Sequence, residues 1–359
     1  MEFGLFFEWP NPELRNWQTL FDESVEQIQL SEELGFDYCL LAEHHFSNYG
    51  MSPSPLLQAL RIGERTKKIR IGTAALILSM WQPLRVAEEV AVLDNFLDGR
   101  FICGVGRGYH PYELGGFGID PVETRQRFAE TLDVMMKAWT SETSFTYEGQ
   151  YIKVPEPISV FPKPRQRPHP PMWLAGTSAD SMVIAAERDL MPMASALSGQ
   201  DVLRSQLEIY FGSLQKQGKA IDELELGLDI MIYVAPTDEE ARKEIAQVRW
   251  QMRALQALVR RQVTNGKVDV VPVADELDDE TFEERLFFGS PETVIRKLRR
   301  YGELGATRLI AWTQIGGIQH EKIMRSVRLM GEEVIPALRD VNPPKDLGRR
   351  ILEEASSKP

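Results

Sequence analysis

The sequence predicts an α/β protein folded as a (β/α)8 TIM barrel, a single domain with insertions. Short apolar runs alternate with amphipathic helical patterns along most of the chain, which is typical of parallel strands joined by helices. Eight such runs can be assigned, the number that closes this barrel. Polar residues directly follow several runs, and chemistry in this architecture lies at the C-terminal ends of the strands. A doubly wound sheet is the alternative fold.

The first half of the chain contains four predicted strands, each followed by a predicted helix. The strands cover 3–7, 36–42, 69–78 and 101–106, and the helices cover 19–34, 54–66, 83–97 and 123–139. Gly35 and Gly99 mark two helix ends, because glycine readily adopts the left-handed backbone found there. Pro83 marks a helix start, where its missing N–H costs nothing.

The second half continues the alternation but is interrupted twice. Its strands cover 172–175, 191–196, 226–234 and 307–312, and its helices cover 179–188, 201–217, 237–262, a segment from 291, and 319–338. We assign 1–340 to the barrel domain and about 144–170, with a hairpin pattern and six prolines, to an insertion. The acidic, irregular segment at about 263–288 is a candidate lid. Residues 341–359 are expected to form an exposed C-terminal tail.

Composition excludes several classes of partner. The chain of 359 residues is 43% apolar and carries a formal net charge of -12, so we expect neither nucleic acid nor membrane binding. The N-terminus has no signal-peptide pattern, and no apolar run approaches the roughly 20 residues of a membrane span. Cys39 and Cys103 lie in apolar runs and are expected to be free thiols. A cytoplasmic location follows as an expectation.

The segment Glu43-His44-His45-Phe46 follows the second predicted strand. A histidine titrates near neutral pH and can serve as acid or base, or orient a reactant. A salt-bridged structural histidine is the alternative. Neighbouring strand residues point to opposite faces, so at most one of the two imidazoles faces the barrel interior. No further cluster of metal ligands is apparent in the sequence, and we expect no metal.

Two further motifs follow predicted strands. Gly104-Val105-Gly106-Arg107-Gly108 would let the backbone approach a flat ligand and places a cation at the top of the barrel. Gly176-Thr177-Ser178 precedes the helix that begins near Ala179, and the free N–H groups and hydroxyls of such a helix start can bind an anion. Conformational glycines and simple helix capping are the respective alternatives. Arg125 could supply a counter-charge.

Together these segments resemble the bacterial luciferase-like (LLM class) flavin-dependent monooxygenases. The resemblance covers nearly the whole chain except the tail. The matching segments are Glu43 to Phe46, Gly72 to Ala75, Gln82 to Glu89, Leu93-Asp94, Gly99 to Phe101, Gly104 to Gly108, Phe117 to Asp120, Ala175 to Ser178, Gly289 to Thr293, and Val334 to Pro336.

The resemblance implies an FMN-dependent monooxygenase that uses reduced FMN (FMNH2) and O2, through a flavin C4a-hydroperoxide, to oxygenate a small organic substrate. His44 matches the catalytic histidine, and Ala74 and Ala75 match a pair joined by a cis peptide under the flavin. Arg107 matches a flavin-contacting arginine. Gly106 replaces a reactive cysteine of luciferase, which argues against light emission. The remaining cofactor-binding positions implied by the resemblance are Arg125, Gly176, Thr177, Ser178 and Ser181.

The resemblance also implies partners. A separate NAD(P)H:flavin reductase would supply the reduced flavin, and a homodimer is expected through helices near strands two and three. A deazaflavin (F420)-dependent oxidoreductase that transfers hydride is the first alternative. A non-catalytic flavin-binding subunit is the second, and it is disfavoured because His44, Arg107 and Arg125 are all present. No charged cluster in the sequence identifies the substrate.

Overall fold

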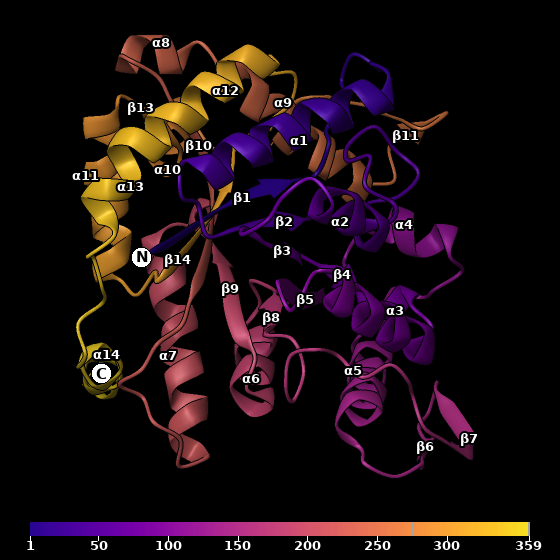
Figure 1. Ribbon diagram of the computed structural model, residues 1–359. Helices are drawn as coiled ribbons and strands as arrows, with labels where there is room; N and C mark the ends of the chain where they lie inside the picture. Colours follow the sequence, from indigo (N-terminus) through magenta and orange to yellow (C-terminus); the bar gives the residue numbers. More distant parts are fainter. Residues whose placement is uncertain (275, 358–359) are drawn as a thin grey trace.

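Eight parallel strands close into a barrel in the computed structural model, which describes residues 1–274 and 276–357 (Figure 1). In order around the barrel the strands are β1 (Glu2–Phe7), β2 (Tyr38–Leu41), β3 (Arg70–Thr73), β5 (Phe101–Gly106), β8 (Met172–Ala175), β9 (Met191–Ser195), β10 (Gly227–Val234) and β14 (Arg308–Trp312). The first and last strands pair from Glu2 with Arg308 to Phe6 with Trp312 and so complete the ring. The (β/α)8 prediction is confirmed, and the doubly wound sheet is excluded.

The helices surround this ring and follow the predicted alternation. They are α1 (Trp17–Glu33), α2 (Pro55–Gly63), α3 (Pro83–Phe96), α5 (Thr124–Thr140), α6 (Ala179–Arg188), α7 (Gln200–Lys216), α8 (Asp238–Arg242), α9 (Ile245–Val259), α11 (Pro291–Glu303), α12 (His320–Leu329) and α13 (Ile335–Leu338). A π-helical turn, Met330–Val334, joins the last two. The short helix α4 (Pro111–Gly116) was not predicted. It follows β5, at the end of the barrel where strands terminate.

The third strand is shorter than the predicted run 69–78. β3 ends at Thr73, a cis peptide joins Ala74 to Ala75, and β4 (Leu76–Ile77) pairs with β5. Apolar residues continue through the whole segment, so hydrophobic periodicity could not reveal the break. The cis Ala74–Ala75 bond implied by the family resemblance is present.

The segment at 144–170 contains an antiparallel hairpin of β6 (Phe145–Glu148) and β7 (Lys153–Ile158), as the alternation there predicts. The segment at 263–288 is more ordered than predicted. It contains a small hairpin, β11 (Val263–Thr264) with β12 (Lys267–Val268), then α10 (Asp279–Arg285), and β13 (Phe287–Gly289), which pairs with β10. Residue 275 of this segment and residues 358–359 of the tail lie outside the described residues.

The segment 341–359, expected to form an exposed tail, includes a helix with a buried face. Residues Leu347–Ser356 form α14, which packs beside α7 at the lower left of Figure 1. Leu347 and Ile351 are buried in the core because they recur on one face of this helix. Prolines before the helix and charges within it hide this pattern in the composition.

Burial agrees with the expectation for the two cysteines. Cys39 and Cys103 are buried free thiols, and burial raises the pKa of both. Among the helices of the described residues, none combines the length and apolar character needed to cross a bilayer.

Candidate active site at the mouth of the barrel

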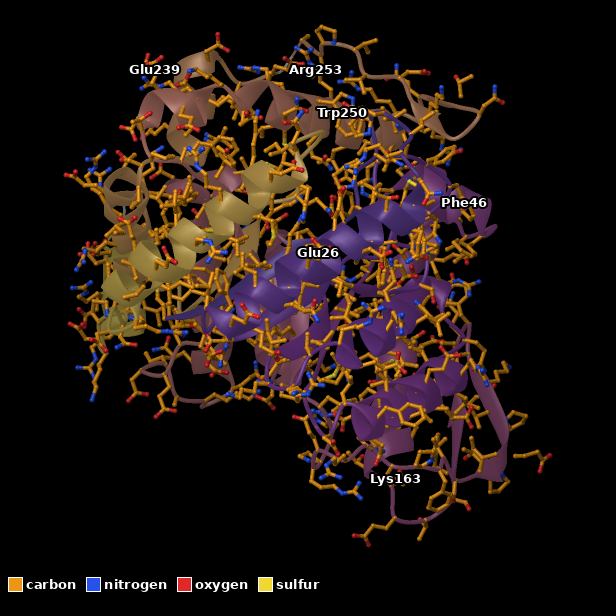
Figure 2. The ribbon with its side chains drawn as sticks, turned by 45° about the horizontal axis from the view of Figure 1, so that its top comes forward. Glu26, Phe46, Lys163, Glu239, Trp250 and Arg253 are labelled. Atoms are coloured by element: carbon orange, nitrogen blue, oxygen red, sulfur yellow. The ribbon has the colours of Figure 1, made fainter. Side chains whose placement is uncertain are left out.

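A cavity of about 530 Å³ opens at the C-terminal ends of the barrel strands. We call it the barrel-mouth cavity. Helix α9 closes one side of it through Met252 and Leu255. Figure 2 shows Trp250 and Arg253 of the same helix near the top of the molecule. The cavity contains both apolar walls and buried polar groups, the usual composition of a small-molecule site.

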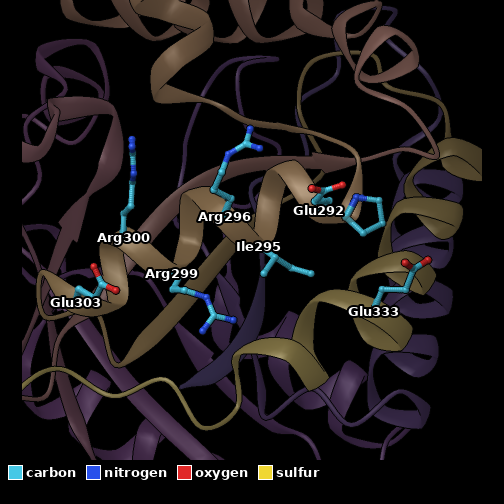
Figure 3. Close-up of a pocket in the computed structure, with 8 residues that line it drawn as sticks. Glu292, Ile295, Arg296, Arg299, Arg300, Glu303 and Glu333 are labelled. Carbon is cyan, nitrogen blue, oxygen red and sulfur yellow. The ribbon is translucent and has the colours of Figure 1, made fainter.

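A second hollow, about 590 Å³, lies on the outer surface of α11 (Figure 3). Its walls are exposed arginine and glutamate side chains of α11, with Glu333 beside them. It lies on the helix layer, away from the strand ends where chemistry is placed in barrels. The barrel-mouth cavity is therefore the candidate active site.

Nine of the ten predicted site residues line the barrel-mouth cavity. They are His44, Ala74, Ala75, Gly106, Arg107, Gly176, Thr177, Ser178 and Ser181. Arg125 is the exception, since it lies outside the lining and forms an ion pair with Asp180, with 3.1 Å between Nη1 and Oδ2. Its predicted cofactor contact therefore remains a prediction.

His44 is held between two carboxylates. Its Nδ1 lies 3.0 Å from Glu113 Oε1, and its Nε2 lies 3.3 Å from Glu8 Oε1. Glu113 is carried by α4 and also accepts the backbone N–H of His45 at 2.9 Å. The edge of the Tyr49 ring packs against the imidazole at 4.8 Å between centroids. These contacts fix the orientation of His44 at the cavity wall.

The two carboxylates also determine the charge of His44. Burial alone would lower its pKa, but Glu113 and, less strongly, Glu8 outweigh burial and raise the pKa to about 10. The His44 charge in turn helps to lower the pKa of Glu113, against the effect of burial. His44 is therefore a protonated imidazolium at neutral pH, with both ring nitrogens donating. It can act as a proton donor without first acquiring a proton.

The raised pKa of His44 predicts how stability depends on pH. In the unfolded chain a histidine titrates near ~6.5, so the folded state binds its proton more tightly. The stabilisation is fully present below pH ~6.5 and is lost as pH rises towards 10. We expect the difference in unfolding free energy between the wild type and His44→Gln to shrink over this range in urea denaturation. A constant difference would contradict the pairing.

His45 does not line the cavity and has a structural position. Its Nε2 lies 3.1 Å from Glu43 Oε1, and its ring packs edge-on against Phe117 at 4.8 Å. Glu43 also accepts the N–H of Ile77 at 2.8 Å and the indole N–H of Trp81 at 2.9 Å. The Glu43 carboxylate thus fastens the segment after β3 to the end of β2.

Small residues form part of the cavity wall. A Cβ added at Gly106 would lie 3.1 Å from the Cβ of Ala75, so any larger side chain would enter the space above Ala74 and Ala75. Arg107 follows at the end of β5. Among the described residues, its guanidinium makes no hydrogen bond or ion pair, and its backbone carbonyl accepts the hydroxyl of Ser79 at 2.7 Å. A planar ligand could lie on this wall with a free cation beside it.

The start of α6 forms another part of the lining. Ser178 caps the helix by accepting the N–H of Ser181 at 3.2 Å, and the two hydroxyls lie 2.9 Å apart. A side chain at Gly176 would overlap Ser181, which explains the glycine there. The hydroxyls and the positive end of the helix dipole suit a phosphate. The negative charge of Asp180, in the first turn of α6, would disfavour binding of an anion there. The ion pair of Asp180 with Arg125 offsets this negative charge.

Sequence reasoning missed four titratable residues at or beside this cavity. Glu8 follows β1, and Asp229 lies on β10. His110 immediately precedes α4, and Glu113 lies in its first turn. Burial and, secondarily, Glu8 raise the pKa of Asp229 to about 7. Burial and the His44 charge lower the pKa of His110 to about 4, so His110 is neutral. Of these four residues, only Asp229 could have been noticed in the sequence, because it is an acidic residue inside the apolar run 226–234.

One trio of side chains has the spacing of metal ligands within the described residues. The ligand atoms of His44, His110 and Glu113 lie within 4.8 Å of one another. His44 already carries a proton that both Glu113 and Glu8 attract, which opposes metal binding. The expectation of no metal remains a prediction.

The family model of the luciferase-like monooxygenases matches residues 1–308. The chain belongs to this family. A relative in Sinorhizobium fredii, the uncharacterized protein y4vJ, is 32% identical over 331 residues, covering 91% of this chain and 92% of the relative. The oxygenase component of the flavin-dependent trigonelline monooxygenase of Acinetobacter baylyi is 25% identical over 347 residues, covering 94% and 95%.

Solved structures place this luciferase-like monooxygenase among known barrels. Monooxygenase RslO1 from Streptomyces bottropensis superposes with a TM-score of 0.81 at 26% identity, covering 94% of this chain and 99% of that one. An F420-dependent secondary alcohol dehydrogenase superposes with a TM-score of 0.75 at 21% identity, covering 94% and 99%. The second likeness shows the shared fold alone. Monooxygenase chemistry is therefore the activity of the family, and the choice of cofactor is a separate question.

Proposed function

We propose that this chain is the oxygenase component of a two-component system that uses reduced FMN and O2 to oxygenate a small organic substrate. The observation that carries the proposal is the protonated His44, held by Glu113 and Glu8 at the wall of a cavity that also includes the α6 start. Reduced FMN, when bound, would supply the electrons that activate O2. A separate NAD(P)H:flavin reductase would deliver it, as the words "oxygenase component" indicate for the trigonelline relative.

The residues of the cavity fit the parts of FMN. Ala74, Ala75 and Gly106 leave a flat surface for the ring system. Ser178 and Ser181 would hold the phosphate, with Arg125 available from its ion pair with Asp180. His44 would donate its Nε2 proton to an oxygen of the reacting group. Met252 and Leu255 would limit access of water.

Anaerobic titration of the protein with FMNH2 and with reduced F420, followed by O2 uptake, tests the proposal. We expect binding of FMNH2 and O2 consumption that increases with a suitable organic substrate. Preferential F420 binding and hydride transfer without O2 would support the first alternative instead. FMN binding without turnover of any screened substrate would support the non-catalytic subunit.

The lid at about 263–288 is part of the same proposal. Glu276 accepts two bonds from Arg253 of α9, at 2.7 and 2.9 Å, and Arg249 of α9 packs over the Phe282 ring at 4.4 Å. The segment is thus fastened to the helix that closes the cavity. We expect FMN to slow tryptic cleavage within it, and Glu276→Gln to speed cleavage a few-fold, since such ion pairs contribute about 0.2–1 kcal/mol.

The matched control for this lid experiment is Glu283→Gln, which removes an exposed pair with Arg242 rather than with α9. Cleavage that is unchanged by FMN would count against a lid.

A homodimer through α2 and α3 also remains a proposal. Leu57 of α2 and Phe96 of α3 are large apolar side chains that are 68% and 66% exposed, and the two helices contact each other. We expect Leu57→Glu/Phe96→Glu to convert a dimer to a monomer in size-exclusion chromatography with light scattering. Phe161→Glu is the control, since Phe161 is 73% exposed but lies in the insertion. A wild-type monomer would refute the proposal.

A further inference from the structure

Asp229 is a partly buried residue whose carboxyl group the proposed flavin site does not use. It is the third residue of β10 and lines the barrel-mouth cavity. Among the described residues, its buried Oδ1 has no hydrogen-bond partner, and its Oδ2 accepts only the hydroxyl of Ser195, at 3.4 Å. Buried polar groups are almost always paired, and an unpaired carboxyl lowers stability. Such a group in a cavity indicates a partner that arrives with a ligand.

The strand register places Asp229 at the floor of the cavity. Asp229 pairs with Ile310 of β14, and Trp312 lies two residues further towards the mouth on the same face. Phe6 of β1 is the register partner of Trp312 of β14. Their rings pack edge to face, with 5.5 Å between the ring centroids. The carboxyl therefore lies one layer of side chains below an aromatic pair, and a ligand passes these rings to reach it.

The charges around Asp229 favour a cation there. The charged group that acts on it most is Glu8, another carboxylate. The only cations among the described lining residues are His44 and Arg107. His44 is already paired with Glu113 and Glu8, and Arg107 lies at the end of β5, three strands away around the barrel. Within the described part of the chain, the Asp229 carboxyl thus has no neutralising partner. A cation would favour its ionised form, which burial and Glu8 disfavour, and the two rings suit a cation.

We propose that the substrate of this enzyme is a small organic amine whose protonated nitrogen donates hydrogen bonds to Asp229 at the floor of the barrel-mouth cavity. This inference rests on the proposed function, because it assumes that FMN occupies the wall formed by Ala74, Ala75 and Gly106. The ammonium group would give Oδ1 its missing donor and neutralise the floor. Phe6 and Trp312 would pack against the organic part.

Binding of one-ring probes to the FMN-loaded protein tests the inference. Benzylamine, benzyl alcohol, benzaldehyde and benzoate have similar shapes and differ in charge and donors. We expect benzylamine to bind about tenfold tighter than the two neutral probes, because a charge-assisted hydrogen bond is stronger than a neutral one. We expect benzoate to bind weakest. Isothermal titration calorimetry without O2 measures each affinity without any turnover.

Asp229→Asn should reduce the preference for benzylamine to less than about twofold, because it removes the negative charge and keeps the shape. Asp340→Asn, an exposed site with the same change of charge, should leave the preference intact. Equal binding of benzylamine and benzyl alcohol by the wild type would overturn the inference, even if Asp229→Asn fails to fold. Tighter binding of benzaldehyde would instead indicate a protonated Asp229 that donates to a carbonyl, and would also overturn it.

The same protein preparation separates this inference from the proposed function. FMN affinity is measured first. A protein that binds FMN but shows no preference for the amine refutes only the substrate class. A protein that binds no FMN refutes the proposed function.

Discussion

Replacing His44 with alanine is expected to lower substrate oxygenation at saturating reduced FMN by about 10²- to 10⁴-fold, the usual contribution of a positioned acid or base. The imidazolium is lost, and Glu8 and Glu113 are left as two buried carboxylates without the charge between them. Turnover of a substrate found by O2 uptake measures the effect. Because the proposed role of His44 is proton donation rather than FMN binding, FMN affinity should change less than turnover.

Two further variants show whether the proton on His44 matters. His320→Ala is the control, because His320 lies at the start of α12 and contacts Gln27 and Glu26, outside the cavity lining. Glu113→Gln removes the carboxylate that most strongly raises the His44 pKa. The turnover of this variant should decline at lower pH than that of the wild type, whose decline is expected near pH 10. Full activity of His44→Ala would refute the acid role.

Replacing Gly104 with alanine is expected to cause the largest loss of stability among single changes in the site region. The added Cβ would overlap the carbonyl oxygen of Thr73, which belongs to the backbone and cannot rotate away. Overpacking of a rigid core costs about 1–3 kcal/mol, and we expect the upper end or more here. Urea denaturation measures the change in unfolding free energy.

Gly115→Ala is the matched control for Gly104→Ala. Gly115 lies in α4, and an added Cβ there would meet nothing within 4 Å. Alanine favours a helix over glycine by about 0.8–1.0 kcal/mol, so the stability should be unchanged or slightly higher. If Gly104→Ala were as stable as this control, the close approach of β5 to the end of β3 would be disproved.

Most of the barrel could be predicted because its strands and helices have regular periods. The helix at Ala179–Arg188 has the predicted bounds, since Ser178 and Asp189 mark its ends. The break after Thr73 could not be predicted from the pattern, because Leu76 and Ile77 are as apolar as the strand before them. α14 was missed because only two large apolar residues, Leu347 and Ile351, mark its buried face within a charged segment.

The site was predicted only in part, because some of its residues are brought to the cavity by tertiary contacts that the sequence pattern does not reveal. His44 and Ser178 are recognisable from their positions after strands. Glu113 is not, because α4 has six residues and two glycines, too few for a helical period. Its place beside His44 depends on how the segment after β5 folds over the barrel. Gly104 was interpreted as room for a ligand, whereas the structure uses it to admit the Thr73 carbonyl.

The pairing of β1 with β14 has a consequence for biosynthesis. Phe6 and Glu8 come from the first strand of the chain and the residue just after it, while Ile310 and Trp312 come from the last strand. During translation, this wall of the cavity therefore cannot form until more than 300 residues after Glu8 have left the ribosome. Until then β1 has an open hydrogen-bonding edge, which is prone to aggregation. Chains arrested before residue 312 should fail to retain FMN, and chaperones that cover sheet edges should improve the yield of active protein.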